Sequence, residues 1–257
     1  MLNHRTIIVL CTLLWIVLIG LNFIYPIHWF WFLISILFFI SIEFYGAYFV
    51  DSGFHIKTIN FVKTNEKIIA LTFDDGPLPQ RTEKVLNVLK IFNAKATFFC
   101  IGNRIKGNEN LLRRIHEEGH LIGNHSFSHS NLFDLSNTKQ MTKDLQAGNE
   151  EIKKVIGKSP LFFRPPFGVT TPYLAKACRK LNFDVIGWNI RSLDTTIKNK
   201  EELVERIIKR IKPGSILLLH DTVDGVDLAL EDILNYLKQN NYKVVELDKL
   251  IQRKAYA

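Results

Sequence analysis

Cysteine is scarce in this sequence, with three residues in a chain of 257, and the three lie far apart in apolar surroundings. They are Cys11, Cys100 and Cys178, and no Cys-x-x-Cys pair occurs. Isolated cysteines of this kind indicate neither a zinc knuckle nor a disulfide framework. They also leave the redox compartment of the protein open.

The sequence has no block of lysine and arginine with interleaved aromatic residues, although its formal net charge is +8. Because a nucleic-acid groove usually carries such a block, we predict no nucleic-acid partner. The basic excess favours an anionic neighbour, such as lipid head groups or a charged wall polymer. It fits an ordinary solvated surface rich in lysine equally well.

Charge is almost absent from the first fifty residues. Residues 6–25 carry no formal charge, and residues 27–49 carry one, on Glu43. Each run is long enough to cross a hydrocarbon core as a helix. Trp and Tyr residues surround the break between the two runs, as expected at a membrane interface. We therefore predict a hairpin of two transmembrane helices over residues 1–50.

Two observations leave alternatives to this hairpin. A cleaved signal peptide would also be apolar, but residues 6–25 form a long run without a small-residue cleavage site, and a second apolar run follows at once. Glu43 lies toward the end of the second span, where its carboxyl group can snorkel to the surface, stay protonated or serve a function inside the membrane.

After a linker predicted at residues 51–64, apolar runs with strand character alternate with runs of helical periodicity. This alternation predicts one α/β domain with parallel strands over residues 65–257. Seven such units suit a barrel better than an open sheet, although periodicity does not separate the two. We expect strands at residues 68–73, 96–101, 121–124, 161–164, 184–188, 215–219 and 242–247, and helices at 80–92, 108–118, 141–156, 200–211 and 226–240, with a further helical pattern around Cys178.

The first strand stops at two adjacent carboxylates, Asp74 and Asp75, which Gly-Pro follows. The carboxyl ends of parallel strands form the edge at which α/β sheets place their chemistry. Neighbouring carboxylates repel each other, so a buried pair needs a cation, an arginine or a shared proton. An isolated Asp-Asp-Gly-Pro is usually a solvated turn, and the residues at the other strand ends argue against that interpretation here.

Two histidines at a spacing of four, His125 and His129, begin where the third strand is expected to end. On a helical turn such a pair points to one side, about 6 Å apart, and can share a metal ion. The spacing alone fits a surface or capping pair equally well. Beside the two aspartates at the same edge, it predicts a metal site.

A rival pair lies just upstream, in His116-Glu117-Glu118-Gly119-His120. It fits the H-E-x-x-H pattern of zinc metalloproteases, which requires both histidines on one helix face. Gly119 is expected to end the helix, so His120 should leave that face. We interpret both histidines as helix-end residues and keep the protease as the lesser alternative.

Arg164 follows the fourth strand and precedes two prolines. At an edge rich in carboxylates, a fixed guanidinium group neutralises one aspartate and keeps it ionised, as a general base requires. Pro165 and Pro166 have no N–H, so the next free backbone donor is on Phe167, which could face a developing oxyanion. A plain proline turn is the alternative.

The sixth strand ends at a third histidine, His220. A lone histidine at a strand end is usually structural, but at this edge it could protonate a leaving amine. Asp194 is a candidate partner that would orient its ring.

Taken in order, these residues resemble the five motifs of polysaccharide deacetylases with a NodB homology domain, also called carbohydrate esterase family four. The resemblance covers roughly residues 65–225; its first two motifs are highly specific and its fourth is loose. The motifs are Thr72-Phe73-Asp74-Asp75-Gly76-Pro77, His125-Ser126-Phe127-Ser128-His129, Arg164-Pro165-Pro166-Phe167-Gly168, Trp188 with Asp194, and Leu218-Leu219-His220.

The resemblance implies a distorted (β/α)7 barrel and a role for each motif residue. Asp75, His125 and His129 would bind one divalent metal ion, with zinc expected and cobalt, manganese or nickel as alternatives. Asp74 would be the base that activates the bound water, and His220 the acid that protonates the departing amine. Of the remaining residues, Arg164 would tune Asp74, the Phe167 amide after Pro166 would stabilise the oxyanion, and Leu218 would line the acetyl pocket.

Two positions depart from the family pattern. Thr195 stands where the family usually has Trp after the motif-four aspartate, so part of the apolar wall of the pocket is missing or comes from elsewhere. Ser130 replaces a common Pro after the second histidine. Neither change removes a catalytic group, but the first leaves the preferred sugar open.

The sequence therefore predicts a metal-dependent hydrolase that removes N-acetyl groups from the sugars of a glycan, with peptidoglycan or a related envelope polysaccharide as the expected substrate. A catalytically silent glycan-binding or scaffold protein of the same fold is the main alternative. The basic residues that flank the two spans favour cytoplasmic ends, whereas the glycan substrates of the family favour an extracytoplasmic domain on this multi-pass membrane protein. We expect the latter, and the oligomeric state stays open.

Overall fold

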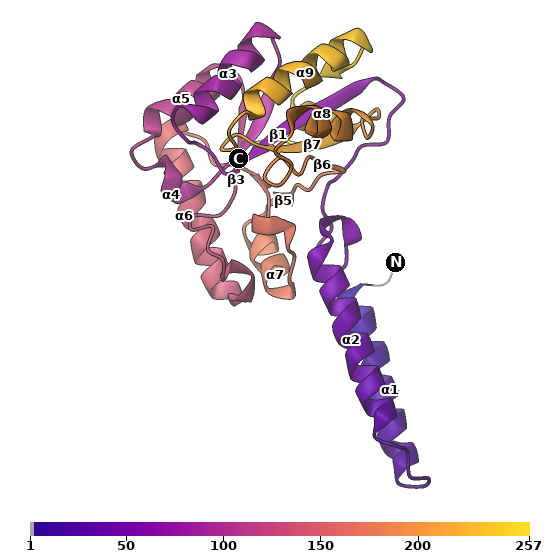
Figure 1. The fold of residues 1–257 in the computed structure, drawn as a ribbon. Helices are drawn as coiled ribbons and strands as arrows, with labels where there is room; N and C mark the ends of the chain where they lie inside the picture. Colours follow the sequence, from indigo (N-terminus) through magenta and orange to yellow (C-terminus); the bar gives the residue numbers. More distant parts are fainter. Residues whose placement is uncertain (1–2) are drawn as a thin grey trace.

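The computed structural model describes residues 3–257. Two helices, α1 (His4–Asn22) and α2 (Phe30–Tyr48), run antiparallel and project together from an α/β domain, as Figure 1 shows. Each is long and apolar enough to cross a membrane, judged by length and composition. The two helices expected from the apolar runs are therefore present as a hairpin.

Glu43 does not stand alone in this hairpin. Nδ1 of His4 lies 2.9 Å from a carboxylate oxygen of Glu43, and Nε2 of His55 lies 3.8 Å from the other. The three side chains meet at the base of the hairpin, next to the domain. The structure pairs this carboxyl group with a histidine 39 residues away in the sequence.

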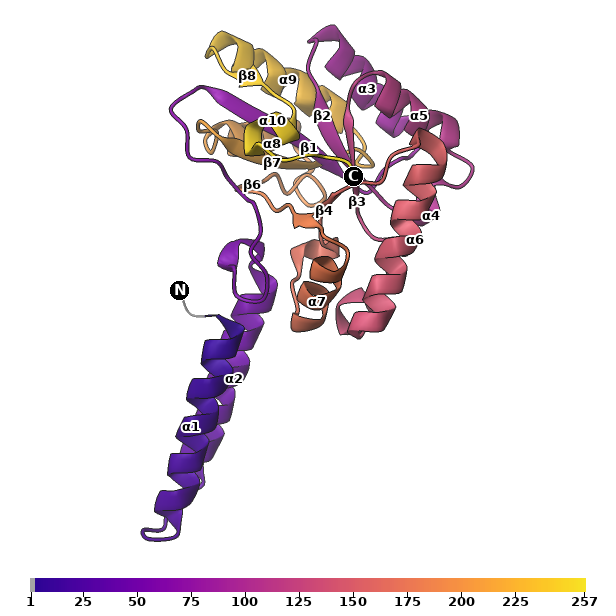
Figure 2. The ribbon, with the colours of Figure 1, turned by 180° about the vertical axis from the view of Figure 1, so that it is seen from behind.

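The domain is built on parallel strands in the spatial order β5-β4-β3-β2-β1-β7-β6, with β8 paired to the start of β1. The sheet curls, and helices cover its outer side (Figures 1 and 2). This confirms the predicted α/β barrel class. The strands are β1 (Ile68–Asp74), β2 (Ala96–Cys100), β3 (Leu121–Asn124), β4 (Phe162–Phe163), β5 (Asp184–Val185), β6 (Ile190–Arg191), β7 (Ser215–His220) and β8 (Lys243–Val244).

All seven expected strands are present, several of them shorter than expected, and β6 is an addition. Its two residues are too short to produce a periodic pattern. The predicted helices occur within a few residues of their expected bounds, whereas α4 and α10 were not expected. The helices of the domain are α3 (Arg81–Ile91), α4 (Gly102–Ile105), α5 (Glu109–Glu117), α6 (Thr138–Ile156), α7 (Pro172–Lys180), α8 (Lys200–Ile208), α9 (Val226–Gln239) and α10 (Leu247–Ile251).

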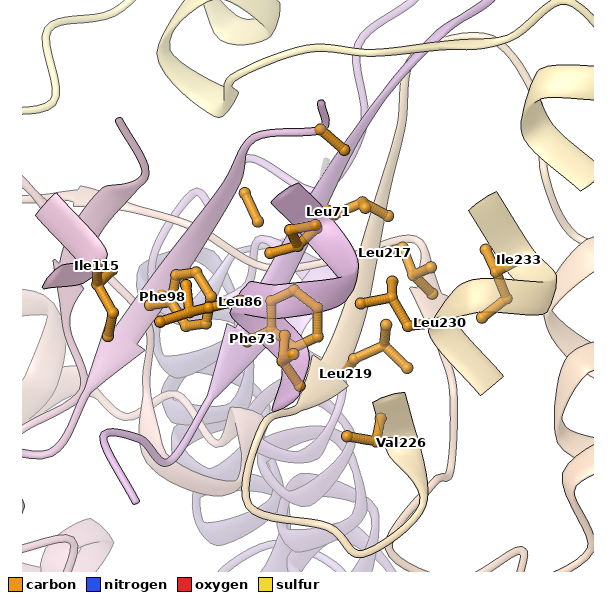
Figure 3. Close-up of a cluster of buried hydrophobic side chains, with 14 of the residues drawn as sticks. Leu71, Phe73, Leu86, Phe98, Ile115, Leu217, Leu219, Val226, Leu230 and Ile233 are labelled. Atoms are coloured by element: carbon orange, nitrogen blue, oxygen red, sulfur yellow. The ribbon is translucent and has the colours of Figure 1, made fainter. Parts of the chain in front are cut away.

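Alternate residues of β1 face opposite sides of the sheet. Leu71 and Phe73 point outward and pack with side chains of α3, α5 and α9 in the main core (Figure 3). Successive strand residues alternate between faces, so Thr72 and Asp74 point into the curl. The pattern that buries the core thus directs a carboxylate into the interior of the domain.

Residues 59–62 connect the hairpin to two strands of the curled sheet. The N–H of Ile59 donates to the carbonyl oxygen of Val185 at the end of β5, over 2.9 Å. The N–H of Val62 donates to the carbonyl oxygen of Gly214 just before β7, over 3.0 Å. This segment therefore links β5, an edge strand of the sheet, to the start of β7.

Replacing Leu86 of α3 by alanine should lower the free energy of unfolding by about 2–5 kcal/mol, because the fully buried side chain would leave a cavity. The measurement is urea unfolding of the full chain in detergent micelles, followed by circular dichroism. Leu228→Ala on α9 is the matched control: that leucine is 55% exposed, and its loss should cost less than about 0.5 kcal/mol. Equal losses would contradict the core position of Leu86.

Candidate metal centre and catalytic pocket

Three side chains from two strand ends converge on one point. Asp75 directly follows β1, and His125 directly follows β3. The Nε2 atoms of His125 and His129 lie 3.6 and 3.4 Å from Oδ1 of Asp75, and one ligand atom from each residue lies within 4.8 Å of the others. Atoms bound to a tetrahedral zinc ion at about 2.1 Å lie about 3.4 Å apart, so this donor set fits one metal ion.

The hydrogen bonds of His125 decide which ring nitrogen faces that point. Its Nδ1 lies 2.8 Å from the carbonyl oxygen of Arg164. A carbonyl oxygen only accepts, so Nδ1 carries the proton and the Nε2 lone pair is free for a metal ion. Burial and the neighbouring His125 lower the pKa of His129, which favours the neutral ring that a metal ion requires.

The two histidines do not lie on a helical turn, and that prediction was wrong. Residues 125–129 form an irregular loop in which Ser126 and His129 have positive φ angles of 64° and 45°. The carboxylate of Asp144 on α6 accepts two backbone N–H groups of this loop, at 2.8 and 3.2 Å. The loop brings the rings to one side, and Asp144 is a positioning residue that sequence reasoning missed.

Arg164 is fully buried beneath Asp74. Its Nη1 donates to Oδ1 of Asp74 at 2.7 Å and to the hydroxyl of Thr72 at 2.8 Å. Nη2 and Nε donate to two carbonyl oxygens, of Gly187 at 2.8 Å and Ile186 at 3.3 Å. Burial lowers the pKa of Arg164, and its pairing with Asp74 opposes that change. Oδ2 of Asp74 lies 3.9 Å from Nε2 of His125, beside the candidate ligands.

His220 at the end of β7 is held by Asp194. Nδ1 of the ring lies 2.8 Å from Oδ1 of Asp194, and the backbone N–H of His220 donates to Oδ2 at 2.7 Å. Burial alone would lower the pKa of His220, but the hydrogen bond and charge of Asp194 outweigh it and raise the pKa to about 9. The ring is therefore protonated at neutral pH and can donate a proton.

One pocket of about 230 Å³ collects these groups. Phe167 lines it with a φ of 56°, and its N–H has no acceptor among residues 3–257. Thr195 lines it as well, at the position where a Trp was expected from the resemblance. Of the predicted residues, Asp74, Asp75, His125, His129, Phe167, Leu218 and His220 line the pocket, while Arg164, Asp194 and Pro166 lie behind its wall.

Asp221 is a second residue that sequence reasoning missed. It is fully buried and accepts a hydrogen bond from the Thr82 hydroxyl at 2.6 Å, while its Oδ1 has no partner in the described part of the chain. Burial raises its pKa to about 7. A Cβ atom on Gly76 would lie 2.2 Å from Asp221, so only glycine allows the turn after Asp75 to pass this close.

The two histidines of the H-E-x-x-H segment, His116 and His120, do not share a helix face, as expected. Gly119 has a φ of 83° after α5, and Nδ1 of His120 accepts the N–H of Ala96 at 3.2 Å. Within residues 3–257, the groups of side chains able to share a metal ion are the one in this pocket and the one at the base of the hairpin. The H-E-x-x-H segment forms neither.

Comparison with known proteins points to the same family as the sequence motifs. The family model described as polysaccharide deacetylase matches residues 61–186. A peptidoglycan-N-acetylmuramic acid deacetylase of Bacillus subtilis is 37% identical over 195 residues, which cover 74% of this chain and 74% of that protein. A peptidoglycan-N-acetylglucosamine deacetylase of Bacillus cereus is 37% identical over 200 residues, which cover 75% of this chain and 92% of that protein.

Solved structures share the fold. A peptidoglycan N-acetylglucosamine deacetylase superposes with a TM-score of 0.74 at 31% identity, covering 77% of this chain and 94% of that one. A Bacillus anthracis pseudoenzyme of carbohydrate esterase family four superposes with a TM-score of 0.71 at 26% identity, covering 77% and 71%. Because active and silent proteins share this fold, the residues of the pocket have to decide between them.

Replacing His129 by alanine should weaken binding of Zn²⁺ in the pocket by at least about 100-fold, because one of three protein ligands is lost. The affinity is measured on the full chain by competition with a chromogenic chelator. His116→Ala, from the rival pair, is the control and should leave the affinity unchanged. Unaltered binding by His129→Ala, or an equal loss in His116→Ala, would refute this metal site.

Proposed function

The chain belongs to the polysaccharide deacetylase family, and from that premise we propose that it removes N-acetyl groups from the amino sugars of peptidoglycan or a related envelope glycan. The observation that supports this most is the convergence of a three-ligand metal set, a carboxylate paired with arginine and a histidine paired with aspartate on one pocket. These are the parts that hydrolysis of an amide at neutral pH needs.

We assign the metal ligands to Asp75, His125 and His129. A divalent ion held there, with zinc expected, would polarise the acetyl carbonyl and lower the pKa of water. Asp74 then serves as general base: Arg164 fixes its Oδ1, and Oδ2 remains free on the side of the ligands. That oxygen takes the proton from the attacking water.

The remaining groups act on the substrate amide. The N–H of Phe167, which Pro166 precedes, donates a hydrogen bond to the oxyanion that forms from the acetyl carbonyl. His220 gives its Nε2 proton to the departing amine, and Asp194 keeps the ring in the orientation that allows this. Leu218 lines the same pocket and surrounds the acetyl methyl group.

A catalytically silent glycan-binding protein is the second candidate, because a pseudoenzyme has this fold. Two pairs of oppositely charged side chains favour an active enzyme over a silent protein. Arg164 with Asp74 and Asp194 with His220 each place a buried acid against a cation, at 2.7 and 2.8 Å. A protein that only binds glycans has no need of a fixed base and a fixed acid.

We infer that the hairpin anchors the domain in a membrane. Its apolar side chains are mostly exposed, with only 11% of the most apolar window of each helix buried, whereas the core helix of a soluble protein would bury them. A peptidoglycan substrate lies outside the cytoplasmic membrane, so the domain is placed on the outer face. Protease treatment of intact cells would remove a domain exposed there.

Asp74→Asn should lower kcat for acetate release by about 10²–10⁴-fold, because the amide cannot accept the proton of water. The assay measures acetate released from N-acetylated glycans by the full chain with Zn²⁺. Glu117→Gln is the matched control, since Glu117 would be the base of the rival metalloprotease, and it should retain full activity. The proposed mechanism fails if Asp74→Asn turns over normally.

Asp194→Asn should move the alkaline limb of the pH–rate profile to lower pH. The raised pKa of His220 keeps the acid form present up to about pH 9; without the charge of Asp194, burial dominates and lowers that pKa. The profile of kcat against pH is the measurement. Asp232→Asn, which removes an exposed ion pair with Lys200, should leave the profile in place, and a shift there would contradict the assignment.

A further inference from the structure

Arg191 lines the pocket next to the proposed catalytic groups. It lies on β6 opposite Leu218 of β7, and it is exposed. Its carbonyl oxygen is bonded, but across residues 3–257 its guanidinium group has no hydrogen-bond, ion-pair or aromatic partner. A guanidinium group in a pocket with no partner of its own is free to bind a substrate.

The carboxylates around the pocket are already matched. Asp74 pairs with Arg164, Asp194 pairs with His220, and Asp75 faces the two ligand histidines. In the described part of the chain, Arg191 is therefore the charged side chain of the pocket wall that has no partner. The pocket therefore contains a guanidinium group that no carboxylate of the pocket binds.

Arg206 on α8 holds the strand of Arg191 in place. Its Nε donates to the carbonyl oxygen of Ser192 at 3.1 Å, and its Nη2 donates to that of Arg191 at 3.4 Å. Nη1 of Arg210 donates to the carbonyl oxygen of Arg206 at 2.8 Å, so three arginines lie close together. Such a group produces a positive potential that attracts an anion to this wall.

We propose that Arg191 binds a carboxylate of the substrate strand and that the sugar deacetylated is therefore N-acetylmuramic acid. This inference rests on the proposed function. N-acetylmuramic acid carries its N-acetyl group and a lactyl ether on adjacent ring carbons, whereas N-acetylglucosamine carries no charge. A sugar whose acetyl group enters the pocket brings the lactyl carboxylate close to the wall of the same pocket, where a guanidinium group can bind it through two parallel hydrogen bonds.

The test compares acetate release from three substrates by the full chain with Zn²⁺. They are N-acetylglucosamine oligomers, peptidoglycan strands stripped of stem peptides, which expose the lactyl carboxylate, and strands with intact peptides. The ratio of kcat/KM for stripped strands over oligomers should fall by about 10- to 100-fold in Arg191→Gln, the value of one charge-assisted hydrogen bond. Arg191→Lys should restore part of it, because the charge remains.

Two further readouts separate recognition from a structural effect. Raising the salt concentration should lower the ratio in the natural chain but not in Arg191→Gln, because salt screens the exposed charge. Mass spectrometry of the digested strands should show the lost acetyl group on muramic acid. Arg113→Gln on α5 is the control: this exposed arginine, bonded to Asn110, lies outside the pocket, and its loss should leave the ratio unchanged.

Several results would overturn the inference. An unchanged ratio in Arg191→Gln, or acetate lost only from glucosamine residues, would refute it. A loss confined to strands with intact peptides would assign the carboxylate to the peptide and refute the sugar assignment. If no substrate releases acetate, the proposed function fails, and binding of stripped strands to the Arg191→Gln and natural chains then tests Arg191 by itself: equal affinity refutes its role.

Discussion

The buried ion pair between Arg164 and Asp74 is the interaction on which the pocket depends. Removing a guanidinium group from water costs on the order of several kcal/mol unless its donors are satisfied. Here it bonds β1 through Asp74 and Thr72, and the chain after β5 through the carbonyl oxygens of residues 186 and 187. Since β5 and β1 are four positions apart in the sheet, this one side chain bridges the inside of the curl.

The alternation of side chains along β1 links the position of the Asp74 carboxylate to packing of the hydrophobic core. Phe73 enters the core under the helices, and its neighbour Asp74 must therefore face inward, where Arg164 lies. A shift of one residue in register would move Phe73 into the pocket and the carboxylate into the core. The register with β7, which pairs Asp74 with His220, also sets the proposed base beside the proposed acid. The register that packs the core therefore also aligns the proposed catalytic groups.

Periodicity and the positions of the strand ends predicted most of the fold and the centre of the site. Apolar runs located the strands, and parallel strands bring their carboxyl ends to one edge, which is why Asp74, Asp75 and His220 could be grouped in advance. Periodicity has no information on loops with positive φ at non-glycine residues, and four of these, Asp75, His129, Phe167 and Leu193, line the pocket. For the same reason the helical turn predicted at residues 125–129 was wrong. Asp144 and Asp221 were not predicted, because their hydrogen bonds join residues far apart in the sequence.

Hydrogen bonds connect the hairpin to the loop that forms part of the pocket wall. The N–H of Thr170 donates to the carbonyl oxygen of Ala47 at the end of α2, over 3.0 Å, and its hydroxyl donates to that of Gly46. Thr170 follows the loop that carries Phe167, so the proposed oxyanion donor lies three residues from a contact with α2. If α2 spans a membrane, these two hydrogen bonds connect the loop that carries Phe167 to the end of the helix nearest the domain. The proposed oxyanion donor and the hairpin are therefore coupled through Thr170, so a change at the end of α2 acts on the pocket wall.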